Sequence, residues 1–322
     1  MRLALQGTVA AVAVTFAAAT SAEALVIKSS DVHAMGYPTT DAIAAMGECL
    51  EEKTNGDMSI EIFHSMQLGG EKEALEQVQL GALEMTRVSV GVVGPIVDDF
   101  NAFNLPYVFR SIDHSHEVVD GEIGQDLLAR LEAGGLIGLG FMDAGARSFY
   151  NKERPIEKPE DLQGLKVRVM QNPIFIDMMT AMGGNGIPIA FNELYTALQT
   201  GVVDGAENNP PSYLTQNHYE QAGYYSLTEH LIVPEIFVFS KNVWETLDEA
   251  QQQAIRECSK VATEKERELW KAMEDQAMAK LQEMGVQINE VDKQPFIEAT
   301  APVREKFGEQ YAEILGKIEA VQ

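Results

Sequence analysis

The strongest limit on the fold comes from a helical pattern near the end of the chain that no glycine or proline interrupts. Thr246 and Glu249 form a capping-box pattern at its start, and the pattern continues to about Met284. A helix of this length would extend about 50 Å, which is longer than one small domain. We therefore expect this helix to run across two domains.

Short apolar runs alternate with helical patterns in the rest of the chain, which is typical of an α/β protein. The turn Asp143-Ala144-Gly145 lies between two strand-like runs and is the expected hinge. A strand over residues 236–241 returns toward the first half, and a final helix ends the chain. The other predicted strands and helices include residues 25–30, 38–53, 58–63, 71–80, 83–90 and 166–170.

The first 24 residues have the pattern of a secretory signal peptide. Arg2 precedes an alanine-rich apolar run over residues 3–19 that carries no charge, and small residues follow it. Cleavage is expected after Ala22 or Ala24. A membrane anchor would need about 20 strongly apolar residues, whereas this run is weakly apolar. We therefore expect an exported protein without a membrane-spanning helix.

The charge balance limits the possible partners. The chain has 49 Asp and Glu residues against 24 Lys and Arg residues, and its net charge is −25. Nucleic acids and anionic membrane surfaces require a basic face, so we expect neither as a partner. An anionic small ligand stays possible, because a few buried arginines can set the local field.

Metal and enzyme motifs are absent from the sequence. Cys49 and Cys258 could pair in an oxidising compartment, but both lie in helical patterns far apart, and the sequence leaves this open. His114-Ser115-His116 is better explained as a helix start than as a metal site. Without a nucleophile motif or a phosphate loop, we expect a binding protein with no cofactor. A secreted enzyme is the alternative.

Two arginines in strand-like runs are candidate anchors for a carboxylate. Arg168 lies in the alternating run 165–170, and Arg147 follows the expected hinge. A guanidinium binds a carboxylate through two parallel hydrogen bonds, so such residues suit an organic acid. The alternative is that each arginine faces solvent or forms a structural ion pair.

Other polar and aromatic residues lie where strands end. Asn208 follows an expected strand, and its amide could serve both acceptors and donors, although turn formation would also explain it. His33 and Tyr37 follow the first strand, where crevices form in α/β sheets. Phe191 precedes a helix start, a position that core residues often occupy.

Four segments in this order carry a resemblance to a known family. They are residues 67–71 (QLGGE), 145–151 (GARSFYN), 164–169 (GLKVRV) and 195–208 (YTALQTGVVDGAEN). Together they resemble the solute-binding proteins of tripartite ATP-independent periplasmic (TRAP) transporters. The resemblance extends over nearly the whole chain after the expected signal peptide.

This resemblance implies a two-domain α/β fold of the periplasmic binding protein type, with crossing strands and a long helix that spans both domains. The first domain would comprise residues 25–145 and 234–273, and the second residues 146–233 and 274–322. The protein would act in the periplasm as the receptor for a small-molecule carboxylate and would pass it to the membrane subunits of a TRAP transporter.

The resemblance also implies roles for individual residues. Arg168 would form the ion pair with the ligand carboxylate, assisted by Arg147 and Asn208. Glu71 would bind ligand hydroxyls, and Phe191 would pack on the ligand.

A finer resemblance points to the branch of the family that binds hexuronates and related sugar acids. It rests on residues 69–73, 86–90 and 225–230, and on His33 with Tyr37. Ser89 stands where sialic-acid-binding relatives carry a glutamate, which argues against sialic acid. The expected hydroxyl-binding residues are Glu71, His33, Ser89 and Asn208, and Tyr213 is added as an aromatic contact. Aldonates, dicarboxylates and 2-oxo acids are the alternative ligands.

Overall fold

The computed structural model describes residues 24–321. The predicted signal peptide therefore lies almost entirely outside the described residues. Within the described part of the chain, no helix is both long and apolar enough to cross a membrane.

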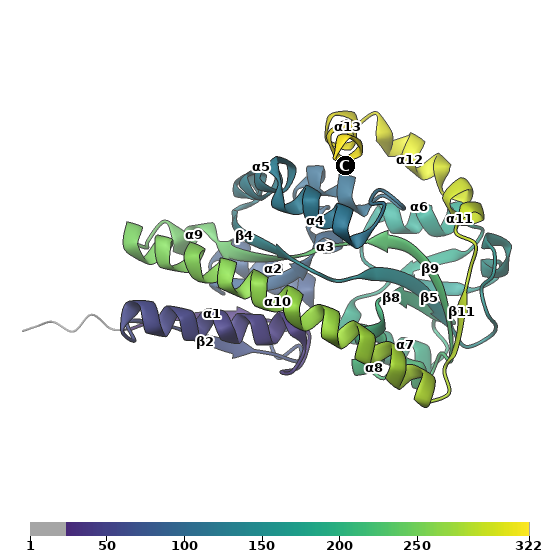
Figure 1. The fold of residues 1–322 in the computed structure, drawn as a ribbon, viewed down its shortest axis with the longest axis horizontal. Helices are drawn as coiled ribbons and strands as arrows, with labels where there is room; N and C mark the ends of the chain where they lie inside the picture. The colour runs from purple at the N-terminus through teal and green to yellow at the C-terminus, as the bar shows by residue number, and fades with distance from the viewer. Residues whose placement is uncertain (1–23, 322) are drawn as a thin grey trace, which may run out of the picture.

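The first sheet combines four strands from the N-terminal half with one strand from later in the chain (Figure 1). In spatial order its strands are β2 (Met58–Phe63), β1 (Leu25–Ser30), β3 (Met85–Ser89), β10 (Glu235–Ser240) and β4 (Leu136–Met142). The returning strand β10 runs antiparallel to both of its neighbours. The predicted α/β fold class is confirmed, and the return of the chain near Ile236 is also present.

The second sheet is built from the middle of the chain and one later strand. In spatial order its strands are β11 (Gln287–Glu290), β9 (Tyr224–Ile232), β5 (Ala146–Asn151), β8 (Gly205–Asn208), β6 (Lys166–Val169) and β7 (Asn185–Pro188). Only short segments separate β4 from β5 and β9 from β10. Two strand connections therefore pass directly from one sheet to the other.

The long helix α10 (Glu249–Glu283) is a single helix of 35 residues that passes along both sheets (Figure 1). It packs against α1 (Pro38–Thr54) and β4 at one end and α8 (Pro210–Thr215) toward the other. Its capping box is formed by Asp248 and Gln251, so the predicted start at Thr246 and Glu249 is wrong. The Thr246 hydroxyl instead donates to the carbonyl of Val243 in the preceding turn.

A disulfide joins Cys49 of α1 to Cys258 of α10. The two cysteines are 209 residues apart in sequence, but helix packing brings their Cα atoms to 5.6 Å. The two cysteines, whose pairing the sequence left open, are therefore bonded, and the bond ties the long helix to α1, which packs on β2 of the first sheet.

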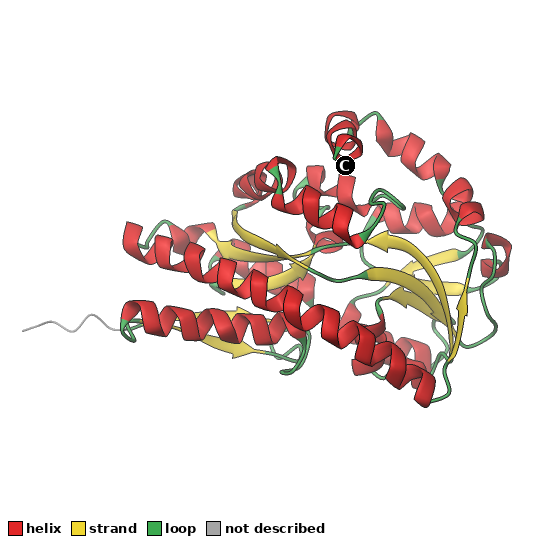
Figure 2. Ribbon diagram, in the orientation of Figure 1, coloured by secondary structure: helices red, strands yellow, loops and turns green. Residues whose placement is uncertain are grey.

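The remaining helices pack around the two sheets (Figure 2). The α-helices are α2 (Glu71–Leu80), α3 (Val90–Val93), α4 (Ile112–Asp120), α5 (Glu122–Arg130), α6 (Pro173–Ala181), α7 (Leu194–Gln199), α9 (Lys241–Trp244), α11 (Gln294–Ala299), α12 (Ala301–Gly308) and α13 (Ala312–Ala320). Short 3₁₀ helices are η1 (Asp98–Asn104), η2 (Leu131–Gly134), η3 (Pro159–Leu162), η4 (Phe191–Glu193) and η5 (His218–Glu220). At the C-terminal end, α12 packs on α6 and α13 packs on α5.

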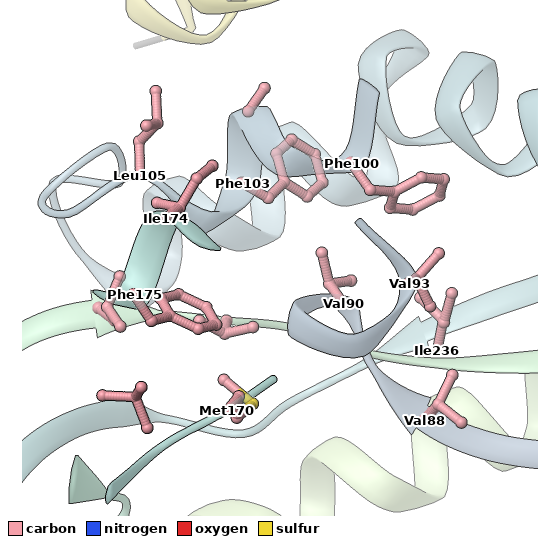
Figure 3. Close-up of a cluster of buried hydrophobic side chains, with 14 of the residues drawn as sticks. Val88, Val90, Val93, Phe100, Phe103, Leu105, Met170, Ile174, Phe175 and Ile236 are labelled. Carbon is pink, nitrogen blue, oxygen red and sulfur yellow. The ribbon is translucent and has the colours of Figure 1, made fainter. Parts of the chain in front are cut away.

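One apolar cluster connects the two halves of the molecule (Figure 3). Val90 from the first half lies in the same cluster as Met170 and Phe175 from the second half. Between them, Gly91 permits close approach, because a Cβ atom there would lie 2.7 Å from the Met170 methyl carbon. The two sheets are thus held close together beside Met170.

Candidate ligand-binding site

A small polar cavity lies where the two sheets meet, with about 330 Å³ of empty space that includes its opening to solvent. It lies next to the carboxyl ends of β1, β3, β6 and β8, where α/β sheets commonly bind ligands. Its lining residues are Val32, His33, Glu71, Arg87, Ser89, Arg147, Arg168, Met170, Phe191, Asn208, Asn209, Ser212 and Glu235. Every site residue predicted from the sequence, except Tyr213, is in this set.

Arg168 is the buried cation in this cavity that lacks a carboxylate partner. Its side chain is 3% exposed, and its Nε atom donates to the carbonyl of Ile189 at 2.7 Å. No carboxylate of the described residues lies within ion-pair distance, and neither Nη atom has a hydrogen-bond acceptor among them. Burial lowers the pKa of Arg168 below its usual value, and the attraction of the Glu207 carboxylate offsets only part of this effect. A buried guanidinium in this state favours binding of an anion.

Arg147 has a different environment, although it belongs to the same sheet. Its Nε atom lies 2.5 Å from Glu207 Oε2, and Nη2 lies 2.9 Å from Oε1. A further bond from Nη1 reaches Asn208 Oδ1 at 2.9 Å. Burial alone would lower the pKa of Arg147, but the charge and hydrogen bonds of Glu207 raise it. Arg147 is therefore already neutralised, and most of its N–H groups are occupied.

The bond from Arg147 fixes the orientation of the Asn208 amide. Asn208 Oδ1 accepts from Arg147 and also from the backbone N–H of Asn209 at 2.9 Å. The Nδ2 donors of Asn208 have no partner among the described residues. Asn208 can thus donate to an oxygen atom in the cavity.

The opposite wall contains an arginine surrounded by three carboxylates. Arg87 is 1% exposed, and its Nη1 atom lies 2.6 Å from Glu71 and 2.7 Å from Glu235. Its Nη2 atom lies 2.5 Å from Asp31. Although burial opposes a charge, these carboxylates raise the pKa of Arg87 well above its usual value. This group of residues, Asp31, Glu71, Arg87 and Glu235, is called the Arg87 cluster below.

Glu235 is a carboxyl group of the Arg87 cluster that lines the cavity and has a raised pKa. Burial is the largest cause that raises the pKa of Glu235, to about 7. The Arg87 charge opposes this rise, and the neighbouring Glu71 carboxylate adds to it. Near neutral pH the Glu235 carboxyl group is thus present in both protonation states.

His33 stacks on Tyr37 with a ring-centroid distance of 3.6 Å and lies edge-on to Phe191 at 5.7 Å. Burial, followed by the Arg87 charge, lowers the pKa of His33 to about 3, so the ring is neutral at physiological pH. Its Nδ1 atom is buried without a hydrogen-bond partner. Tyr37 makes a polar contact to the other half through its hydroxyl, 2.9 Å from Ser212 Oγ.

Ser89 lines the cavity but also has a structural role. Its Oγ atom accepts a hydrogen bond from Gly91 N at 3.3 Å and so caps α3. The same hydroxyl lies 3.5 Å from Met170 Sδ. Phe191, on the other side, lies under Arg168 with 5.7 Å between the guanidinium carbon and the ring centroid.

Larger hollows lie elsewhere on the molecule and have a different character. One, between α5, β4 and α10, contains Arg267, which is paired with Asp120 at 2.6 Å. Another, beside β9 and α11, contains Lys293, which is paired with Glu229. Neither has a buried, unpaired guanidinium, so the smaller polar cavity is the better candidate.

Comparison with known proteins agrees with this geometry. Residues 29–310 match the family described as bacterial extracellular solute-binding protein, family 7. The chain belongs to this family. The predicted resemblance is thereby confirmed at the level of the family, whose members are receptors for solutes.

Solved structures of family members are closely similar. A TRAP periplasmic solute-binding protein from Pseudomonas putida F1, with bound D-glucuronate, is 50% identical with a TM-score of 0.91, covering 92% of this chain and 98% of that one. One from Sulfitobacter sp. NAS-14.1, with bound β-D-galacturonate, is 42% identical with a TM-score of 0.88, covering 92% and 99%. The C4-dicarboxylate-binding periplasmic protein DctP of Rhodobacter capsulatus is 33% identical, covering 93% of this chain and 91% of its own.

The structure places one predicted site residue of this family member elsewhere. Tyr213 is fully buried in an aromatic group, stacked on Tyr225 at 4.9 Å and near Tyr150 at 4.5 Å. Its hydroxyl donates to the carbonyl of Ala222. The ring points away from the cavity because α8 turns Ser212 toward it instead, and the prediction for Tyr213 is corrected.

Sequence reasoning found Glu71 but missed Arg87, Glu235 and Ser212 as parts of the cavity wall. Arg87 lies in a strand with alternating character, which is the same signal that selected Arg168. Glu235 stands at the start of β10, next to the apolar run that predicted the strand. Among 49 acidic residues, nothing local distinguishes Glu235 from a surface carboxylate.

Proposed function

We propose that this chain is the periplasmic receptor of a TRAP transporter and that it binds a hexuronate, D-glucuronate or D-galacturonate, in the cavity between the sheets. The observation that carries the proposal is the unpaired, buried guanidinium of Arg168. Its Nη groups can bind a carboxylate in the bidentate manner. The ligands in the Pseudomonas and Sulfitobacter structures are acids of this kind.

In this proposal, Arg168 holds the ligand carboxylate and Phe191 packs against the sugar. Arg147 acts mainly by holding Asn208, which donates to the ligand. The hydroxyl groups of the ligand form hydrogen bonds with Glu71, His33 and Ser89. This assignment is supported by the position of all these side chains on one cavity.

The proposal includes two domains with the boundaries predicted from the sequence, each centred on one sheet. The connections between β4 and β5 and between β9 and β10 would act as hinges, and ligand contact with both walls would favour the closed form. The radius of gyration from solution scattering should fall when ligand is added. An unchanged profile at saturating ligand would contradict closure.

We further propose that the protein acts in the periplasm and does not transform its ligand. The pattern of the signal peptide and the Cys49–Cys258 disulfide both suit an oxidising compartment. Cell fractionation of a tagged full-length chain tests the location. Incubation of each stabilising acid with the protein, followed by NMR, tests for conversion, and any turnover would favour the alternative of a sugar-acid enzyme.

A ligand panel tests the central proposal. Glucuronate, galacturonate, gluconate, succinate, malate and glucose are compared at equal concentration by the shift in melting temperature and then by calorimetry. We expect a shift with the uronates and none with glucose, which leaves Arg168 without an anion. Stabilisation by succinate or malate but by neither uronate would instead favour a dicarboxylate receptor, as in the Rhodobacter relative.

A further inference from the structure

We infer that the cavity has a cationic wall and an anionic wall, and that Glu235, with Glu71, is a specificity-determining residue that accepts hydroxyl groups and rejects a second carboxylate on the ligand. This inference rests on the proposed function, and it narrows the ligand class to sugar monocarboxylates. Diacids of the same size would be excluded by charge.

The cationic wall comes from the second sheet. Arg168 on β6 has no carboxylate partner in the described chain, and Arg147 on β5 is paired with Glu207. These three groups therefore leave one positive charge uncompensated. Asn208 on β8 adds amide donors to the same wall. This wall matches one carboxylate of a ligand.

The anionic wall comes from the first sheet and the helix α2. The Arg87 cluster has one guanidinium against three carboxylates, so its formal charge is −2 when all are ionised. Asp31 is enclosed by Arg87, by Thr39 Oγ1 at 2.8 Å and by the backbone N–H of His33 at 2.8 Å. The excess negative charge therefore lies with Glu71 and Glu235, both of which line the cavity.

Each of these two glutamates keeps one oxygen atom free for the cavity. Arg87 and the Ser89 N–H bind only Oε1 of Glu71, and Arg87 binds only Oε2 of Glu235. Glu71 Oε2 and Glu235 Oε1 have no donor among the residues that the structure describes. A carboxylate oxygen accepts a hydrogen bond from a hydroxyl group, but it repels another carboxylate.

The two walls together dictate the orientation of the ligand. A monocarboxylate with hydroxyl groups can place its acid group on Arg168 and its hydroxyl groups on Glu71 and Glu235. A diacid would place its second carboxylate against the excess negative charge. At a few ångströms in a partly buried site this repulsion is large enough to weaken binding by about a hundredfold.

Protonation of Glu235 provides an independent test of the same inference. Its pKa is raised to about 7, chiefly by burial, so acidification from pH 8 to pH 6 removes most of one negative charge from the anionic wall. Rejection of a diacid should therefore weaken over this interval. The charged or titratable groups that act on Glu235 are Asp31, Tyr37, Glu71, Arg87, Arg147 and Glu266.

The experiment compares D-glucuronate with D-glucarate, a diacid with the same carbon skeleton, by calorimetric titration and competition. The full chain is compared with Glu235→Gln, Glu71→Gln and the control Glu61→Gln, which removes an exposed charge from the same sheet without touching the cavity. Gluconate, an open-chain monoacid, controls for loss of the sugar ring. The quantity measured is the ratio of the glucarate Kd to the glucuronate Kd.

We expect a ratio above about a hundred in the parent at pH 8 and a fall of about tenfold or more in Glu235→Gln. The control should keep the parent ratio. Acidification to pH 6 should lower the ratio in the parent but not in Glu235→Gln. If Glu235→Gln fails to fold, Glu71→Gln and the pH series of the parent still decide the question.

Two failures can be distinguished. A parent that binds neither glucuronate nor galacturonate rejects the proposed function. A parent that binds glucuronate and glucarate within about threefold of each other rejects the inference alone, as does a ratio that neither variant nor acidification changes.

Discussion

Arg87 and Arg168 are both buried in strands beside the same cavity, yet their charge environments are opposite. Arg87 contacts three carboxylates, whereas Arg168 contacts a backbone carbonyl and an aromatic ring. Replacing Arg87 should therefore affect mainly stability, whereas replacing Arg168 should affect mainly ligand binding. We expect the carboxylates around Arg87 to stabilise the fold together with that cation and to accept hydrogen bonds from ligand hydroxyl groups. We expect Arg168, which has no carboxylate partner, to bind an anion.

Replacing Arg87 should have the largest effect on stability. In Arg87→Met, the buried Asp31 and Glu235 and the partly buried Glu71 lose their shared cation, and the free energy of unfolding should fall by about 5 kcal/mol. Urea denaturation at pH 7 measures this change. The control Arg130→Met removes an arginine whose pairs are exposed and should change stability by less than about 1 kcal/mol. A similarly small change in Arg87→Met would show that the three carboxylates do not depend on Arg87 for stability.

Replacing Arg168 should instead affect binding and leave the fold intact. Arg168→Ala should lose about 3–5 kcal/mol of uronate affinity, because a charge-assisted bidentate pair is broken in a dehydrated cavity. Arg168→Lys should also bind poorly, since an ammonium group cannot reproduce the fork. Calorimetry gives both affinities, with Arg130→Ala as a control. Affinities within tenfold of the parent would remove Arg168 from the site.

The pH dependence of stability should reveal Glu235. The pKa of Glu235 is raised by burial from 4.5 to about 7 in the folded state, so the folded protein binds the extra proton between these values. Stability from this group is thus present below about pH 4.5 and declines as pH rises through 7. Glu235→Gln should gain about 2 kcal/mol relative to the parent between pH 5 and pH 8. A constant difference across this range would show that Glu235 does not titrate there.

The smallest expected effect concerns the ring beneath Arg168. Phe191→Leu keeps an apolar side chain but removes the aromatic face, so the uronate affinity should fall by about 1 kcal/mol. Thermal unfolding of the unliganded variant serves as the control for structural damage. An unchanged affinity would show that the contact between Arg168 and Phe191 does not help the cation to hold an anion.

Local patterns predicted much of the fold. The strands at residues 25–30 and 58–63 and the length of α10 followed from apolar periodicity and the absence of helix breakers. The cap of α10 was misplaced because a second capping pair, Asp248 and Gln251, stands two residues further on. The C-terminal segment, expected to be one helix, is three short helices, with Pro295 and Pro302 in the first turns of α11 and α12.

The strand β9 was not predicted, because its stability depends on partners that are distant in sequence. It pairs with β5 in antiparallel fashion and with β11 in parallel fashion. Neither partner can be identified from the residues of β9 alone.

Candidate residues could be chosen from the sequence where a residue type carries its own chemistry. Arg168 and Arg147 were chosen because a guanidinium suits a carboxylate, but only the structure distinguishes the one without a carboxylate partner from the one that Glu207 neutralises. The Arg87 cluster depends on contacts between β1, β3, β10 and α2, and such contacts leave no local signal. Tyr213 was misassigned for the same reason, since the direction of its ring depends on the packing of α8.

A crystal structure of the chain with D-glucuronate would show whether Arg168 anchors the ligand carboxylate. We expect the carboxylate to accept hydrogen bonds from both Nη atoms of Arg168 and the sugar hydroxyls to face Glu71 and Glu235. A carboxylate bound to Arg87, or one held away from Arg168, would contradict this expectation.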